Sequence, residues 1–351
     1  MHFGARENRP LIRGGGFDRG LLYVKEERFR GWKEGGALVG AYLIKRVISL
    51  IPILFGISVL VFTILHLVPG DPASIMLGTN ATEESIAALR KSMGLDEPLV
   101  TQYLTWIGGL FQGNFGVSVH SGEEILPQIL KRFGITLQLT VFAVLIGWLV
   151  AIPFGIISAI RAHSKTDITV RVMTLLGISV PNFAIGTLLL LASSLYFNWF
   201  PPIDVVSFWE NPVEAFKVFV LPATTMGIVV AAGVMRMTRS AFLETMDKDF
   251  IRTARAKGNN KWTVVLGHAF RNSSIPIVTI AGMQIGYLLG GSVIVEQLFS
   301  IPGLGQYVLE AIYQRDYPVV QGGVLFVALV FVLVNLLIDL IYTWIDPRIK
   351  Y

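Results

Sequence analysis

The sequence predicts an all-α integral membrane protein with six transmembrane helices. Of its 351 residues, 53% are hydrophobic even without glycine, and only 15% are charged, whereas about 25% of residues are charged in soluble domains. The mean hydropathy is +0.62. The chain contains no cysteine, which excludes disulfides, thiolate metal sites and a cysteine nucleophile. Such a composition leaves too little polar surface for an ordinary soluble protein and favours a fold inside a lipid bilayer.

Long apolar runs give the positions of the spans. A bilayer core about 30 Å thick requires roughly 20 apolar residues in a helix, because unpaired backbone polar groups are costly in lipid. The fourth run is the shortest, and Pro181 is expected to kink the third. The predicted spans are residues 47–68, 135–160, 172–197, 218–235, 275–295 and 319–345.

The distribution of basic residues predicts the orientation. Of the 29 lysines and arginines, 23 lie in alternate segments between the predicted spans and 6 lie in the others. By the positive-inside rule the segments with 23 face the cytoplasm, so both termini are expected there. The net charge of +5 is therefore attributed to topology and not to nucleic-acid binding.

Two regions can be distinguished along the chain. Residues 1–41 are expected to form a cytoplasmic N-terminal tail, in which Leu21 to Trp32 would suit a short interfacial helix, with a disordered tail as the alternative. Residues 42–351 are expected to form the transmembrane domain. Its outer segment carries two helix signals, a cap at Thr82 and a helix start at Pro98.

The longest cytoplasmic segment, residues 236–274, has its own pattern. A helical stretch ends at Gly258, two asparagines follow, and a second helical stretch begins near Trp262. Two short helices joined by a glycine turn would present a rigid projection to a cytoplasmic partner. A solvated basic loop that serves only topology is the alternative.

Five stretches in order resemble one family. They resemble the permease subunits of ATP-binding-cassette importers, in the dipeptide, oligopeptide and nickel branch. The resemblance covers about residues 42–351. It is carried by LVPGDPA at 67–73, GLDEPL at 94–99 with NFGVS at 114–118, DFIRTARAKG to HAFRNSSIP at 249–276, FSIPGLGQ to RDYPVVQ at 299–321, and LIYTWIDPR at 340–348.

The resemblance implies a type I importer permease in a bacterial or archaeal cytoplasmic membrane. Its expected partners are a second related permease, two cytoplasmic ATPases, an extracytoplasmic solute-binding protein and the lipid bilayer. No Gly-Lys dipeptide occurs, so the chain lacks a Walker A phosphate loop. We therefore expect no catalytic residues and no cofactor on this chain, with ATP and magnesium on the partner subunits and transport by alternating access.

The resemblance also places the contact with the ATPases. The family's Glu-Ala-Ala is replaced by other residues here, while its glycine is kept at Gly258. The expected coupling residues are Arg252, Thr253, Ala254, Arg255, Ala256, Lys257 and Gly258.

Polar and small residues within the spans are further candidates. Four amides could line a translocation path or join helices: Gln138, Asn182, Gln284 and Asn335. Three glycines at four-residue spacing form a bare strip for helix packing, either within the chain or against a second permease: Gly282, Gly286 and Gly290. Asp339 lies near a span end, where a structural role is favoured.

The expected solute is a short peptide. Amide and hydroxyl groups in the spans can exchange hydrogen bonds with a peptide backbone. Oligosaccharides and nickel are the alternatives within the family, although His66 and His120 do not cluster with other ligands and no metal site is expected. An ion-driven secondary transporter is the alternative from another class, and it would be expected to hold a charged relay at the membrane midplane.

Overall fold

The computed structural model describes residues 46–67, 71–77, 82–92 and 94–345. The described residues from 50 to 345 belong to one compact unit. The predicted tail, its interfacial helix between Leu21 and Trp32, and the end of the LIYTWIDPR stretch lie outside the described residues.

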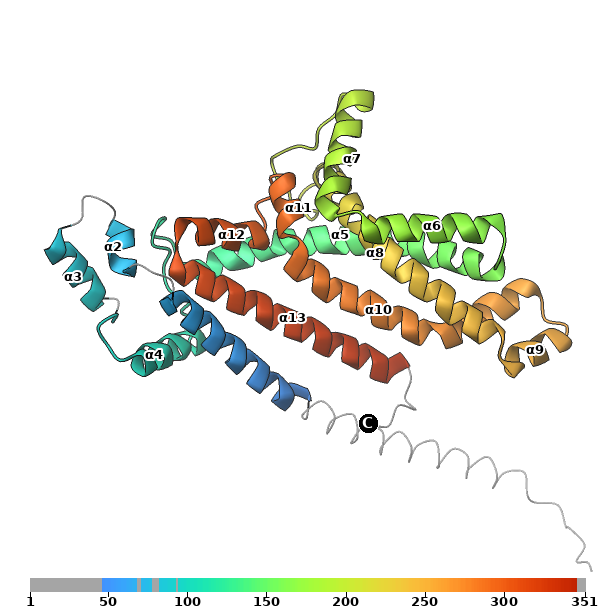
Figure 1. Cartoon of the computed structure of the whole chain (residues 1–351), viewed down its shortest axis with the longest axis horizontal. Helices are drawn as coiled ribbons and strands as arrows, with labels where there is room; N and C mark the ends of the chain where they lie inside the picture. Colours follow the sequence, from blue (N-terminus) through green and yellow to red (C-terminus); the bar gives the residue numbers. More distant parts are fainter. Residues whose placement is uncertain (1–45, 68–70, 78–81, 93, 346–351) are drawn as a thin grey trace, which may run out of the picture. The chain divides into compact units, whose positions relative to one another are not determined.

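The described part is built almost entirely from helices (Figure 1). The single β-bridge there joins Val117 to Glu124. The helices are the first span Arg46–Leu67, α2 Pro72–Leu77, α3 Glu83–Ser92, α4 Leu99–Phe111, α5 Ile125–Ile160, α6 Lys165–Ser179, α7 Asn182–Phe197, α8 Pro212–Met246, α9 Asp249–Ala256, the π-helical segment η2 Thr263–Ala269, α10 Phe270–Gly291, α11 Val293–Leu298, α12 Leu304–Gln314 and α13 Tyr317–Ile345.

Within the described residues, five helices are long and apolar enough to cross a membrane. A sixth span results if α6 and α7 are counted as one, although their axes are bent by 106°. We predicted one kinked helix over 172–197, and the structure shows two helices instead. The prediction underestimated the bend at Pro181. Val180 leaves helical geometry ahead of Pro181, whose ring restricts the preceding residue to extended backbone, and α7 starts in a new direction (Figure 1).

Several helices are longer than their apolar runs. The fourth span, predicted as 218–235 and the shortest, is the 35-residue helix α8. It starts early because the Asn211 side chain accepts hydrogen bonds from the N–H groups of Val213 and Glu214, and because Pro212 suits the first helical position. Its polar end remains helical to Met246, so the predicted segment 236–274 consists of the end of α8, α9, the Gly258 turn, η2 and the start of α10.

The α5–α8 pair forms the centre of the fold. Glycines let the two helices approach closely: a Cβ at Gly147 would lie 2.7 Å from Val230 Cγ1, and a Cβ at Gly155 would lie 2.7 Å from Thr238 Cβ. Helix α6 joins this pair through Gly177, which faces Ala232. The small residues therefore fix α5, α6 and α8 side by side.

The α5–α8 pair has two ends, an α9 end and an α12 end. At the α9 end, α5 finishes, α6 begins and α8 leads into α9. At the α12 end, α5 begins and α10 passes through α11 to α12, whose first N–H, that of Leu304, donates to Thr136 of α5 over 2.8 Å.

Candidate functional site

Helix α9 is held to the bundle by one face only. Ile251 and Ala254 are buried in the core, whereas Arg252, Arg255 and Lys257 are exposed. Asp249 lies in the first turn and Arg255 in the last, which suits the helix dipole. The remaining expected coupling residues are Thr253, Ala256 and Gly258, and all three are exposed. The basic face of α9 is thus free to meet another protein.

A glycine turn follows α9. Gly258 has φ +78°, a left-handed conformation that non-glycine residues adopt at a cost. The Asn259 side chain donates to the carbonyl of Ala254 over 3.1 Å, and the Asn260 side chain accepts from the N–H of Trp262 over 2.9 Å. These bonds hold the turn between α9 and η2 in one shape.

A cavity of about 380 Å³ lies beside this turn. Ile160, Met246, Val264 and Val265 give it an apolar lining, and Arg255, Asn259 and Lys261 add polar groups. The segment that holds the expected coupling residues therefore offers both an exposed basic edge and a cavity next to it.

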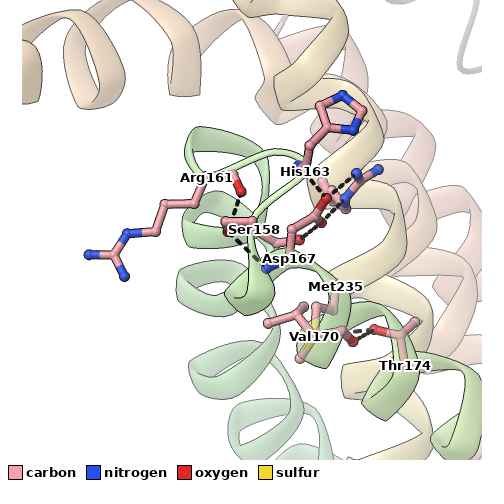
Figure 2. Close-up of polar contacts among 9 residues, drawn as sticks. Ser158, Arg161, His163, Asp167, Val170, Thr174 and Met235 are labelled. Atoms are coloured by element: carbon pink, nitrogen blue, oxygen red, sulfur yellow. Dashed lines mark hydrogen bonds and ion pairs between the residues drawn. The ribbon is translucent and has the colours of Figure 1, made fainter.

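An ion pair with a buried carboxylate, that of Asp167, joins α6 to α8, and Figure 2 shows the polar contacts around Asp167. Asp167, 1% exposed, accepts two hydrogen bonds from Arg239 of α8, from Nε at 2.6 Å and Nη2 at 2.9 Å. It also accepts from Ser158 Oγ at 2.6 Å and from the N–H of His163 at 3.0 Å. One carboxylate thus joins α5, the turn after it, α6 and α8. Removing either partner of such a buried pair costs about 3–5 kcal/mol.

A second buried carboxylate lies at the α12 end. Glu296 is 0% exposed. Its carboxylate accepts from Thr136 Oγ1 at 2.7 Å, Ser292 Oγ at 2.8 Å and the N–H of Gln306 at 2.9 Å. Because Gln306 is the third residue of α12, Glu296 caps that helix from outside. A Cβ at Gly303 would overlap the carboxylate, which explains why glycine occurs there in the FSIPGLGQ stretch.

The same end brings two of the motif stretches together. Asp316, in RDYPVVQ, accepts from Ser118 Oγ at 2.6 Å and from the N–H of Val119 at 3.1 Å, next to NFGVS. His120 Nε2 contacts the carbonyl of Gln314 at 2.7 Å. Residues nearly two hundred positions apart therefore form one connected surface at the α12 end.

A larger cavity of about 1080 Å³ lies among the first span, α3, α4 and the start of α13. Arg90 lies in its wall, and its hydrogen bond to Asp96 at 3.1 Å holds the pKa of Arg90 above its ordinary value. Arg90 also pairs with Asp71 at 3.1 Å. His66 contributes to the wall too, with Nε2 3.2 Å from Gln102 Oε1.

The four amides expected to line a path lie on different helices. Gln138 accepts from the N–H of Phe208 at 2.9 Å, Asn182 is the first residue of α7, and Asn335 donates to the carbonyl of Phe331 at 3.0 Å. Gln284 lies against Gly233, so it is part of the α8–α10 contact. Neither cavity described above includes any of the four.

The glycine strip of α10 faces α13 in part. A Cβ at Gly282 would lie 2.8 Å from Ile338, and one at Gly286 would lie 3.0 Å from Phe331. Gly290 has nothing within 4 Å. In the described residues no group of three or more His, Cys, Asp and Glu side chains is arranged to hold a metal ion.

Sequence reasoning did not single out the Asp167–Arg239 pair. The partners are 72 positions apart, so only the folded chain reveals them. A local signal was available: Ser164, three residues before Asp167, is a helix-capping pattern, and its Oγ accepts the Asp167 N–H at 3.3 Å. With that signal, the third span would have been predicted to begin at residue 165, where α6 begins, and not at residue 172.

Fold and site together define a multi-span membrane protein with a basic helical projection, the class to which transporter permeases belong. Residues 151–351 match the family described as "Binding-protein-dependent transport system inner membrane component", and residues 39–140 match the N-terminal part of such membrane components. The chain belongs to this family. It is therefore a permease of an ATP-binding-cassette importer, as the sequence motifs predicted.

Relatives match along almost their whole length. "Glutathione transport system permease protein GsiC" of Escherichia coli (strain K12) is 40% identical over 310 residues, which are 88% of this chain and 99% of that protein. "Probable peptide ABC transporter permease protein y4tP" of Sinorhizobium fredii (strain NBRC 101917 / NGR234) is 36% identical over 313 residues, 89% of this chain and 100% of that one.

A solved transporter shows the same fold. A chain of the MetNI methionine ABC transporter, in an inward-facing conformation, aligns with a TM-score of 0.52 and 18% identity. The alignment covers 63% of this chain and 98% of that chain. At this identity the likeness bears on the fold alone.

Proposed function

We propose that this permease imports short peptides, including tripeptides of the size of glutathione. The proposal is supported by the names of relatives 36–40% identical, which refer to glutathione and peptide transport. The spans carry amide groups and few charges, which suits weak contact with a peptide backbone. Selectivity would then come from an extracytoplasmic binding protein.

The exposed basic edge of α9 is the single observation that carries the coupling role. The edge consists of Arg252, Arg255 and Lys257, and the opposite face of the helix is buried in the core. A force applied to this edge would therefore be transmitted to the helix bundle. The ion pair between Arg252 and Asp249, at 3.6 Å and exposed, contributes little and leaves Arg252 available. This edge would contact a cytoplasmic ATPase, which holds the ATP and magnesium.

The assembly would contain this chain, a second related permease, two ATPases and a solute-binding protein, in a bacterial or archaeal cytoplasmic membrane. The distribution of lysine and arginine supports cytoplasmic termini and a cytoplasmic α9.

Reconstitution tests the proposal. The permease, its genomic neighbours and the binding protein are placed in proteoliposomes, and ATP-driven accumulation is measured for a labelled tripeptide, an oligosaccharide and nickel. We expect accumulation of the peptide alone. Arg255→Glu should reduce uptake at least tenfold, while Glu210→Gln, an exposed change in the loop before α8, should not. Accumulation of nickel or oligosaccharide without peptide would refute the substrate assignment.

A further inference from the structure

The Asp167–Arg239 pair does more than neutralise two charges. Of the buried carboxylates in the described residues, Asp167, Glu296 and Asp316, only Asp167 pairs with a cation within ion-pair distance. Of its four hydrogen bonds, one comes from α5, one from the turn after α5 and two from Arg239 of α8. The guanidinium contacts both carboxylate oxygens, a geometry that fixes orientation as well as distance.

The helices around this pair leave no room to slide. Thr174 of α6 lies 3.3 Å from the sulfur of Met235 of α8, about two turns from Asp167 along α6 and about one turn from Arg239 along α8. Gly155 and Gly177 place α5 and α6 in contact with α8 closely enough that a single added methyl group would overlap a neighbour. The α5, α6 and α8 segments at the α9 end therefore form one packed block.

This block connects the coupling helix to the broken span. Arg239 is two helical turns before the end of α8, and α9 follows after two residues. Ile251 of α9 belongs to the same buried core as Phe242 of α8. At its other end, α6 reaches the bend at Pro181, beyond which α7 runs in a new direction.

We propose that Asp167 and Arg239 are positioning residues that clamp α6 to α8, so that a displacement of α9 by an ATPase subunit reaches the bend at Pro181 and reorients α7. The inference rests on the proposed coupling role of α9. Without the clamp, α6 would still pack on α8 through Gly177 and Thr174, but the first turn of α6 would no longer be fixed to α8, so a displacement of α9 would not be transmitted to α7.

The main experiment measures the movement itself and needs no transported solute. Spin labels are attached to Tyr196→Cys on α7 and Tyr313→Cys on α12, two exposed positions in a cysteine-free chain. The label-to-label distance is measured in the assembled complex with and without ATP and vanadate. We expect an ATP-dependent shift of several ångströms with the native pair and no shift with Asp167→Asn, although the complex still binds ATP.

The same variants are compared by uptake per ATP hydrolysed. Asp167→Asn should lower this ratio at least tenfold with hydrolysis retained, and Arg239→Lys, which keeps the charge but not the two-pronged contact, should lower it less. The matched control is Glu214→Gln, which breaks an exposed ion pair to Lys217 on the same helix and should change neither readout.

A cross-link separates positioning from mere stability. Thr174→Cys and Met235→Cys are joined by mild oxidation or by a short thiol cross-linker. With the native ion pair present, the link should leave transport intact; with Asp167→Asn, it should restore uptake per ATP to within about twofold of the native value.

Three outcomes would overturn the inference. The first is an unchanged α7 shift in Asp167→Asn. The second is a cross-link that abolishes transport in the presence of the native pair, since the block would then have to flex. The third is a loss of uptake in proportion to lost complex, with the ratio to hydrolysis unchanged. A complex that shows the α7 shift but accumulates no peptide would count against the proposed substrate and leave the clamp standing.

Discussion

At the scale of single residues, the chain stabilises buried carboxylates in two different ways. Asp167 pairs with a guanidinium, whereas Glu296 and Asp316 accept hydrogen bonds only from neutral hydroxyl and N–H groups. At Glu296 the oxygen of Thr136 accepts the N–H of Leu304, and its hydroxyl donates to the carboxylate. All three groups that contact the Glu296 carboxylate donate a hydrogen bond to it, which suits a side chain with two acceptor oxygens.

Glu296→Gln should destabilise the protein by about 1–3 kcal/mol, because the amide NH₂ would replace an acceptor with a donor and leave a buried N–H unpaired. The effect is measured as a lower midpoint of thermal unfolding in detergent. Glu310→Gln, which changes an exposed carboxylate on α12, is the control. Equal midpoints for both variants would contradict this account of the site.

Gly258→Val should reduce uptake per ATP, because a β-branched residue pays at least about 1–2 kcal/mol to adopt the positive φ of the turn. Gly258→Asn should keep most of the coupling, since asparagine tolerates this conformation better than other residues with a side chain. A Cβ here meets nothing within 4 Å, so overlap of the Cβ with a neighbour does not explain a difference. Identical uptake by the two variants would show that the turn's conformation is unimportant.

At the scale of elements, apolar runs locate spans well but miss the polar ends of helices, at the start of α5 and at both ends of α8. The run in α8 stops near Arg236, yet the helix continues to Met246, because its far end is buried by α9 and α10 contacts such as Ser273 Oγ to Thr245 Oγ1 at 2.9 Å. Local signals fared better: the helices expected from Thr82 and Pro98 are confirmed as α3 and α4. The size of the bend at Pro181 depends on the packing of α6 and α7, so the sequence alone could not supply it.

The glycine strip of α10 gives an element-scale prediction. Gly282→Ala and Gly286→Ala should destabilise the protein by about 1–3 kcal/mol, because each new methyl group would crowd α13. Gly290→Ala meets open space and should be neutral or slightly stabilising, since alanine favours a helix over glycine. Thermal unfolding of the three purified variants compares them directly. A ranking with Gly290→Ala as the most destabilised would exclude α13 as the partner of the strip.

At the scale of the whole molecule, family and fold class followed from the order of short motifs and from composition. The candidate site was harder to predict from the sequence. The proposed coupling residues are consecutive, so a local pattern can point to them, and their role stays a prediction. The Asp167–Arg239 pair and the Glu296 site join residues 72 and 160 positions apart, and no local pattern predicts which distant side chains meet.

The orientation in the membrane is predicted by the distribution of basic residues. Single cysteines at Gln112 and at Lys257, both exposed, can be tested in intact cells with a membrane-impermeant thiol reagent, because the chain has no cysteine of its own. We expect Gln112→Cys to be labelled and Lys257→Cys to be labelled only after permeabilisation. Strong labelling at position 257 in sealed cells would show that the topology is opposite to the predicted one.

The burial of α8 bears on how the sequence can change over time. Within its most apolar window 72% of residues are buried, against 17–39% in the other four candidate spans, so it has the least contact with lipid. Its neighbours meet it through glycine, as at Gly147 with Val230 and Gly155 with Thr238. Lipid-facing positions can exchange one apolar residue for another freely, whereas a larger side chain at either glycine requires a smaller one opposite. Substitutions on α8 are therefore expected to occur together with compensating substitutions on the helices that face it. The sequence of α8 should diverge more slowly than the sequences of the other four candidate spans.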